Sequence, residues 1–208
     1  MERSLNIRQN LTICITGTPG VGKTSVSRKL AILLRGNVIN VGTMVIRRKL
    51  FSEYDEYRDT YIVDENSLRD ELRKVIRENK RKGVTCIIDT HLLNALQGLD
   101  IDLVIVLTCD PLLLLNRNIS KGASLQKSIE NAVSEFLNQI LIDVFKIFDK
   151  SKIIVIDTSC KDVNTVANEI LNRILSKKYH DEIDWKQANW SFRAAWISKL
   201  LTSTSGRI

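Results

Sequence analysis

Residues 17–24, with the sequence GTPGVGKT, constrain the fold of this chain more than any other segment. They match the pattern G-x-x-x-x-G-K-[ST] and lie between a short apolar run, residues 11–16, and a segment with helical apolar spacing, residues 25–34. Glycines let the backbone adopt positive φ and approach an anion closely, and inward-pointing N–H groups at a helix N-terminus favour negative charge. The segment therefore predicts a phosphate-binding loop between a strand and a helix, with a glycine-rich turn without ligand as the weaker alternative.

Short apolar runs rich in β-branched residues alternate with helical patterns along the chain. We expect strands at residues 11–16, 38–41, 84–89, 103–107 and 152–156. Helices are expected after the loop and at residues 43–49, 66–82, 112–118, 125–148 and 163–175, with Asn66 or Ser67 and then Ser124 as N-caps. The alternation predicts an α/β fold with a parallel sheet covered on both faces. Residues 51–64 are polar and tyrosine-rich, which suggests a mobile loop over a site.

The overall composition narrows the class of protein. The chain has 208 residues, which suggests one domain with at most an appendage. No apolar run reaches the about 20 residues of a membrane span, and the polar N-terminus lacks a signal-peptide core, so we expect a cytoplasmic protein without a membrane partner. Three of the four cysteines lie in apolar runs, as core residues in a reducing compartment do. A net charge of +7 favours nucleotides, RNA or acidic proteins as partners, although a basic surface serves solubility equally well.

Four side chains are candidates for chemistry on phosphates. Lys23 would reach the β- and γ-phosphates of a nucleotide, and Thr24 would ligate Mg²⁺. Asp89 ends an expected strand at the sheet edge where ligands bind, so it is a second metal ligand or an ordinary acidic strand-end residue. His91, two residues further on, could order water, accept a proton or contact a phosphate, or be an ordinary polar residue.

Four segments together resemble a known family: ITGTPGVGKTS at 15–25, INVG at 39–42, EYDEYRDTYIVDE at 53–65 and IIDTH at 87–91. They are similar to the adenylate kinase isoenzyme 6 family, the atypical adenylate kinases linked to small-ribosomal-subunit assembly in eukaryotes and archaea. The resemblance covers residues 11–175 and indicates an archaeal-type member. It implies a P-loop kinase domain over residues 1–175, with a five-stranded parallel sheet in the order 2-3-1-4-5. It also implies a nucleoside-monophosphate segment at 40–63 and a short lid at 120–130.

The resemblance assigns roles to individual residues. The ATP phosphates would be bound by six loop residues: Gly20, Val21, Gly22, Lys23, Thr24 and Ser25. The adenine of ATP would lie beside Asp157, Thr158 and Ser159. AMP would be bound by residues of the monophosphate segment: Asn40, Val41, Gly42, Tyr54, Asp55, Tyr57 and Arg58. Asp89, on the metal side, and His91 would be catalytic.

The lid departs from the family pattern. Lys121-Gly122-Ala123 stands where the family usually has Arg-Gly-Tyr, and lysine neutralises phosphate without forming a bidentate fork. Arg117, one helical turn earlier, would supply the catalytic guanidinium or pair on a helix surface. Some members also carry an arginine where Ile46 stands here, and the neighbouring Arg47 could compensate.

Two functions of different class follow from these features. The first is an adenylate kinase that converts Mg·ATP and AMP to ADP, with ATP hydrolysis as a second activity because a short lid excludes water incompletely. The second is an assembly ATPase that binds a ribosomal protein or ribosomal RNA, which the net charge and the basic segment 69–82 favour. A solvated helix with internal ion pairs explains that segment as well. A nucleotide-binding protein with negligible turnover fits the intact Lys23, Thr24 and Asp89 poorly.

The last 33 residues differ from the rest of the chain. Residues 176–208 contain all three tryptophans, and Trp190, Ala194, Ile197 and Leu201 share one helical face. This amphipathic tail is expected either to pack on the chain's own core or to form a partner or dimer face.

Overall fold

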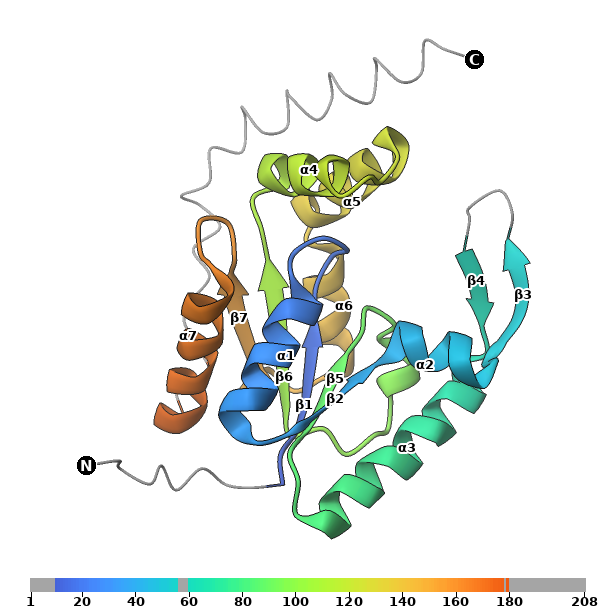
Figure 1. The fold of residues 1–208 in the computed structure, drawn as a ribbon, viewed down its shortest axis with the longest axis vertical. Coiled ribbons are helices and arrows are strands. Elements are labelled where there is room, and N and C mark those ends of the chain that lie inside the picture. Colours follow the sequence, from blue (N-terminus) through green and yellow to red (C-terminus); the bar gives the residue numbers. More distant parts are fainter. Residues whose placement is uncertain (1–9, 56–59, 178, 180–208) are drawn as a thin grey trace.

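A five-stranded parallel sheet forms the centre of the computed structural model, which describes residues 10–55, 60–177 and 179. Its strands are β1 (Thr12–Thr16), β2 (Asn37–Asn40), β5 (Cys86–Asp89), β6 (Leu103–Thr108) and β7 (Ile153–Asp157). They lie in the order β2-β5-β1-β6-β7, with every pairing parallel (Figure 1). Counted along the chain this is the order 2-3-1-4-5, and the predicted fold is confirmed.

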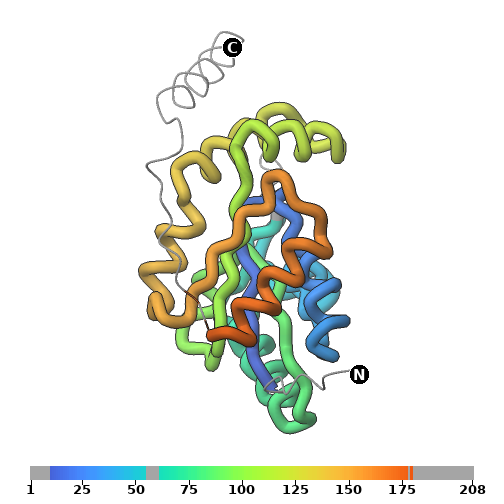
Figure 2. The backbone as a smooth tube through the Cα atoms, turned by 90° about the vertical axis from the view of Figure 1, so that its left-hand side faces the viewer, coloured from blue at the N-terminus to red at the C-terminus, as the bar shows by residue number. Residues whose placement is uncertain are grey.

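Helices cover both faces of the sheet and bury two separate apolar cores. On one face, α1 (Lys23–Leu34) and α7 (Val163–Ser176) pack over Ile13 and Ile15 of β1. On the other, α2 (Val41–Arg48), α3 (Glu65–Lys82) and α6 (Gln139–Ile147) pack over strand residues that include Cys14. In Figure 2, α6 and the pair α1 and α7 lie on opposite sides of the strands. Cys14 faces the opposite core from Ile13 and Ile15 because successive side chains of a strand point to opposite faces of the sheet.

The basic helix α3 begins earlier than expected. Asp64 is its N-cap, and the Asp64 carboxylate accepts hydrogen bonds of 3.1 Å from the backbone N–H groups of Asn66 and Ser67. The prediction of Asn66 or Ser67 as the cap is therefore wrong by two or three positions, because both lie inside the first turn. The end of α3 agrees with its prediction, since Gly83 has a φ of 73° and caps the C-terminus.

The expected long helix 125–148 is in fact two helices. Ser124 caps α5 (Leu125–Phe136) as predicted, accepting from the Lys127 N–H at 3.2 Å, but the chain then turns at Asn138, whose φ is 53°. Asparagine tolerates this left-handed conformation better than most residues. The turn leaves α5 beside α4 (Pro111–Ser120) at the carboxyl end of the sheet, while α6 buries Leu141 and Val144 against the strands (Figure 1).

Two short strands replace the loop expected at residues 51–64. β3 (Phe51–Asp55) and β4 (Thr60–Val63) pair antiparallel in a sheet of their own. Tyr61 packs against the rings of Phe51 and Tyr54, with centroid separations of 4.3 and 5.1 Å. Such aromatic cross-strand contacts stabilise the hairpin. The prediction of a loop rested on the polar residues of the segment and left these contacts out.

Some predictions fall outside the described residues. They include Tyr57, Arg58 and the tryptophan-bearing part of the tail, so the tail's packing and the domain boundary at residue 175 stay predictions. Of the cysteines, Cys14, Cys86 and Cys109 are buried as expected, and Cys160 is exposed. Two short 3₁₀ turns, Asn94–Leu96 and Lys150–Lys152, complete the elements. Across the described part of the chain, no helix combines the length and apolarity that crossing a membrane requires.

Candidate active site

The phosphate-binding loop connects β1 to α1 at the carboxyl edge of the sheet (Figure 1). Gly22 precedes the first residue of α1 with a φ of 108°, and no neighbouring atom would lie within 4 Å of a side chain placed there. The Lys23 ammonium donates to the backbone carbonyls of Gly17 at 2.8 Å and Thr18 at 3.2 Å. Burial lowers the pKa of Lys23 to about 8, against the opposing charges of Asp89 and Glu135. The loop thus keeps a cation at its base and open space at the start of the helix.

Thr24, Asp89 and Asn40 meet beside this loop. One oxygen of the Asp89 carboxylate accepts a hydrogen bond from the Thr24 hydroxyl and another from the Asn40 amide, both at 2.7 Å. Asp89 is only 3% exposed. The three residues come together because β1, β5 and β2 are adjacent parallel strands whose carboxyl ends share one edge.

Asn40 has a second local role that fixes its position. Its side-chain oxygen accepts from the backbone N–H of Thr43 at 2.9 Å and so caps α2. The amide therefore faces Asp89 while the oxygen faces the helix. Val41 and Gly42 follow in the first turn of α2, so the structure brings this part of the predicted AMP segment directly beside Asp89.

The Thr24 hydroxyl and Asp89 carboxylate suit a magnesium ion shared with phosphates. Both are oxygen donors, which Mg²⁺ prefers, and they already converge within 2.7 Å of each other. His91 lies in the turn after β5 and is exposed, whereas Thr90 before it is buried. Desolvation and then the Lys23 charge lower the pKa of His91, while the charge of Asp89 opposes the shift.

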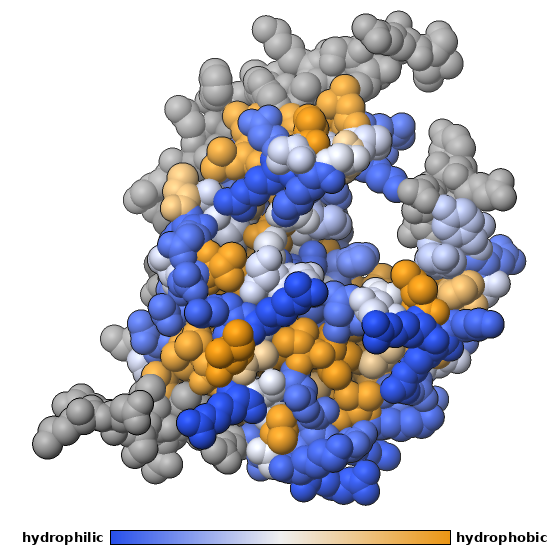
Figure 3. All heavy atoms as spheres, in the orientation of Figure 1, coloured by the Kyte–Doolittle hydropathy of each residue, from blue (hydrophilic) through white to orange (hydrophobic). Residues whose placement is uncertain are grey.

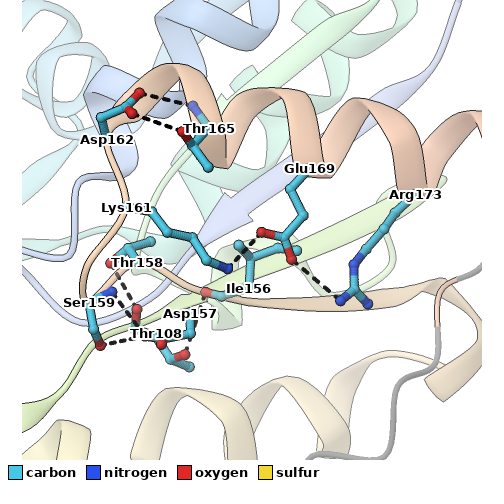
Figure 4. A network of polar contacts seen from close by, with 10 residues as sticks. All are labelled: Thr108, Ile156, Asp157, Thr158, Ser159, Lys161, Asp162, Thr165, Glu169 and Arg173. Carbon is cyan, nitrogen blue, oxygen red and sulfur yellow. Dashed lines mark hydrogen bonds and ion pairs between the residues drawn. The ribbon is translucent and has the colours of Figure 1, made fainter.

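The turn after β7 contacts the phosphate loop from the other side. The Thr158 hydroxyl lies 2.9 Å from the Thr108 carbonyl and 3.1 Å from the Val21 carbonyl. Figure 4 shows Asp157, Thr158 and Ser159 in this turn, with the Ser159 N–H donating to the Asp157 carboxylate at 3.0 Å. The predicted adenine-bordering residues are therefore tied to the strand ends and to the loop itself.

Arg117 extends from α4 to this same turn. Its guanidinium donates to the backbone carbonyls of Thr158 and Ser159, both at 2.8 Å. The structure thus joins Arg117 with the adenine-bordering residues and not with Lys23. Lys121 caps the C-terminus of α4 and is exposed.

The strands of the hairpin, β3 and β4, lie away from the phosphate loop in Figure 1. Tyr54 lies on β3 and is 47% exposed, and Asp55 ends that strand. Figure 3 shows the surface hollowed between the α4 and α5 region and the hairpin side of the molecule. We refer to this hollow as the notch.

Sequence reasoning missed a buried carboxylate at this site. Glu135 of α5 is 8% exposed, accepts from the Cys109 N–H at 2.8 Å and accepts from the Thr18 hydroxyl of the phosphate loop. Its position carried a signal, because Ser128, Ala132 and Glu135 fall on the buried face of an amphipathic helix. A carboxylate on such a face requires polar partners in the interior.

Comparison with known proteins agrees with this geometry. A family model described as an AAA domain matches residues 13–138. A Methanocaldococcus jannaschii protein named "Putative adenylate kinase" is 34% identical over 88% of this chain and 97% of its own length. Proteins of the same name from Saccharolobus islandicus and Pyrococcus furiosus are 36% and 33% identical over 84% of this chain, covering 87% and 91% of their own lengths. With its phosphate loop, its sheet order and its D-x-H strand end, the chain belongs to the atypical adenylate kinase family.

Proposed function

We propose that the protein transfers the γ-phosphoryl group of ATP to AMP and forms two ADP. The observation that supports this most strongly is the convergence of Thr24, Asp89 and Asn40 beside Lys23. A lysine, two oxygen ligands suited to a metal ion and the start of the proposed AMP segment thus lie at one sheet edge. The names of the archaeal relatives favour the same reaction.

Phosphoryl transfer of this kind depends on position and charge more than on covalent chemistry. On ATP binding, the Lys23 ammonium exchanges the Gly17 and Thr18 carbonyls for phosphate oxygens. Thr24 and Asp89 would hold Mg²⁺, which neutralises phosphate charge when bound. The remaining phosphate contacts come from the backbone N–H groups of residues 20–25.

AMP would lie in the notch between Asp89 and the hairpin. We assign its binding to the residues at the start of α2 and to those of the hairpin: Asn40, Val41, Gly42, Tyr54, Asp55, Tyr57 and Arg58. The α-phosphate of AMP is already ionised, so the reaction requires no strong general base. His91 would orient a water molecule or a phosphate oxygen at the rim of the site.

The adenine of ATP would lie against residues 157–159. Arg117 holds the Thr158 and Ser159 carbonyls, so we assign it to the adenine side in the resting protein. A contact of Arg117 with the transferred phosphoryl group requires it to leave both carbonyls. Lys121 is the cation of the short segment between α4 and α5, and we assign it to charge neutralisation on the phosphates.

ATP hydrolysis is proposed as a second activity. The predicted lid, residues 120–130, comprises the end of α4, the four-residue connection to α5 and the first turns of α5. A lid this short would close over little of the site. Water then competes with AMP as the acceptor.

The decisive experiment incubates the protein with Mg·ATP, with and without AMP, and separates ADP from free phosphate. Two ADP per ATP consumed, formed only with AMP, is the expected result. Lys23→Ala is the control and should abolish both signals. If phosphate release does not depend on AMP and no AMP-dependent formation of ADP is found, the kinase proposal is overturned and the protein is an ATPase.

A basic surface favours an additional role in small-ribosomal-subunit assembly through RNA. Arg77 and Arg81 of α3 are exposed, as are Arg47, Arg48 and Lys49 near the end of α2. An ion pair between Arg48 and Glu71 joins the two helices. Other charges of α3 pair internally, including Arg73 with Asp70 and Lys74 with Glu71 at 2.6 Å, which reduces the charge available to a partner.

The RNA role has its own test. The double variant Arg77→Glu/Arg81→Glu should weaken binding to small-subunit ribosomal RNA and flatten its salt dependence. The matched control Lys146→Glu changes an exposed lysine on α6, which pairs with Asp143. Equal RNA binding by both variants argues against the role.

A further inference from the structure

Among the residues that the structure describes, Glu135 is the one buried carboxylate near the site for which the proposed reaction has no task. Its two oxygens are both engaged, one by the Cys109 N–H at 2.8 Å and the other by the Thr18 hydroxyl. Thr18 is 1% exposed and Glu135 8% exposed. Cys109 directly precedes Asp110, the N-cap of α4. One side chain therefore connects the end of α5, the start of α4 and the phosphate loop.

A second contact from the same pair of helices supports the loop beside Thr18. Asn118 of α4 donates its amide to the Pro19 carbonyl at 3.2 Å. Gly20 follows with a φ of 101°, and a side chain there would collide with Asn118. The helices α4 and α5 thus hold three consecutive loop residues from one side.

Thr18 is also linked to the lysine beneath the loop. Its carbonyl accepts from the Lys23 ammonium at 3.2 Å and from the Val21 N–H at 3.3 Å. A displacement of Thr18 therefore alters both the shape of the anion-binding loop and the resting place of Lys23. The contact with Glu135 fixes the side chain of Thr18, and both of these hydrogen bonds involve the Thr18 carbonyl.

A buried carboxylate is costly to keep unless its contacts serve a purpose. Burial raises the pKa of Glu135, although the hydrogen bonds from Thr18 and Cys109 and the charge of Lys23 oppose the shift. Asp157 faces Glu135 as a like charge and adds to the rise. An apolar side chain would fill this interior position at lower cost, but it would leave the Thr18 hydroxyl and the Cys109 N–H without these partners.

We propose that Glu135 is a positioning residue for ATP: through the Thr18 hydroxyl it holds the phosphate loop in its anion-binding shape and makes ATP affinity depend on the packing of α4 and α5. The inference rests on the proposed use of the loop for ATP. It does not place Glu135 in contact with the nucleotide.

The test measures binding of Mg·ATP and, separately, of AMP by calorimetric titration. Thr18→Val removes the hydroxyl at nearly constant shape, and Thr18→Ser restores it. Glu135→Gln alters the acceptor, and Glu78→Gln is the matched control, since Glu78 lies on α3 away from the nucleotide site, is exposed and pairs with Lys82 at 2.6 Å. Thr18→Val and Glu135→Gln should each weaken ATP binding about tenfold, equivalent to about 1.4 kcal/mol. Thr18→Ser and Glu78→Gln should stay within about twofold of the wild type, and AMP affinity should not change.

The double variant Thr18→Val/Glu135→Gln measures how strongly the two side chains are coupled in their effect on ATP binding. If the two side chains act through one contact, ATP binding by the double variant should be no weaker than by the worse single variant. Fully additive losses overturn the inference, as do variants at Thr18 or Glu135 that bind ATP as well as Glu78→Gln does. An equal loss of ATP and AMP binding also overturns it, because that indicates general damage to the fold.

The readout separates this inference from the proposed function. Wild-type protein that binds ATP without phosphorylating AMP overturns the kinase proposal and leaves the binding comparison intact. Should Thr18→Val fail to fold, the comparison of Glu135→Gln with Glu78→Gln decides the same question, since both substitutions keep the shape of the side chain.

Discussion

The Thr24 hydroxyl donates a 2.7 Å hydrogen bond to the Asp89 carboxylate, joining the first turn of α1 to the last residue of β5 across 65 positions of sequence. Asn40 donates to the same oxygen from the end of β2. The carboxylate is therefore already oriented by two neutral donors. Because these donors belong to regular elements, the fold itself holds the proposed metal-binding pair together.

Asp89→Asn tests the metal-binding role of this carboxylate. The amide oxygen can still accept one hydrogen bond, so the variant should fold, but it loses the negative charge that favours Mg²⁺. We expect ADP formation from Mg·ATP and AMP to fall at least about a hundredfold. The measurement is the initial rate across a series of Mg²⁺ concentrations. Asp100→Asn is the control, because Asp100 is exposed and pairs with Lys80. Equal rates for both variants would contradict the assignment.

Asn40→Asp should make the thermal stability depend on Mg²⁺. Aspartate still caps α2, but its carboxylate then faces Asp89 at the present 2.7 Å contact, and two like charges there repel. Without Mg²⁺ the variant should lose about 1 kcal/mol or more, roughly 2–4 °C in melting temperature for a chain of this size. Added Mg²⁺ should restore more stability to the variant than to the wild type.

The control for Asn40→Asp is Asn66→Asp. It adds the same charge in the first turn of α3, where the side chain is exposed. Its melting temperature should respond to Mg²⁺ as the wild type does. A variant at position 40 that melts independently of Mg²⁺ would show that no ion binds beside Asp89.

The buried Glu135 predicts a pH dependence of stability. Burial raises its pKa above the ordinary value of 4.5, so the folded state holds the proton more tightly than the unfolded state. This contribution favours folding below pH 4.5 and is lost as pH rises through the raised pKa. The free energy of unfolding of the wild type, minus that of Glu135→Gln, should therefore decrease as pH rises from about 4 towards neutrality.

Denaturant titrations of both proteins at several pH values measure this difference. Taking the difference removes the opposite contributions of carboxylates with lowered pKa, such as Asp64 and Asp162, which both proteins share. A difference that stays constant with pH would mean that Glu135 titrates as in the unfolded chain.

Two substitutions in α1 test the core directly. Leu30 is fully buried between α1 and the sheet, whereas Ile32, two residues later, is 73% exposed. Leu30→Ala should lower the free energy of unfolding by about 2–5 kcal/mol, because it leaves a cavity. Ile32→Ala should change it by no more than about 0.5 kcal/mol. Comparable losses measured by urea denaturation would indicate that a partner surface covers Ile32.

Much of the fold is readable from local sequence. The strands β1, β5, β6 and β7 are short, mostly apolar and mostly buried runs. Gly22, Gly83 and Ser124 mark helix ends by backbone or capping chemistry that acts within a few residues. The order of the strands came from the family resemblance and not from their spacing. The turn at Asn138 was missed, because apolar periodicity continues through it and only packing on the sheet favours the break.

The residues of the candidate site also fall into those that the sequence reveals and those that only the structure brings together. The phosphate loop and the strand-end Asp89 are recognisable because their chemistry lies in one short segment each. The sequence by itself determined that a phosphate-binding loop, a strand-end carboxylate and an α/β sheet occur together. Only the tertiary structure decided that Arg117 reaches the Thr158 and Ser159 carbonyls and that Glu135 meets Thr18, 117 positions away. Local residue pattern specifies backbone conformation, but which side chains meet in the interior depends on how the completed helices pack over the sheet edge.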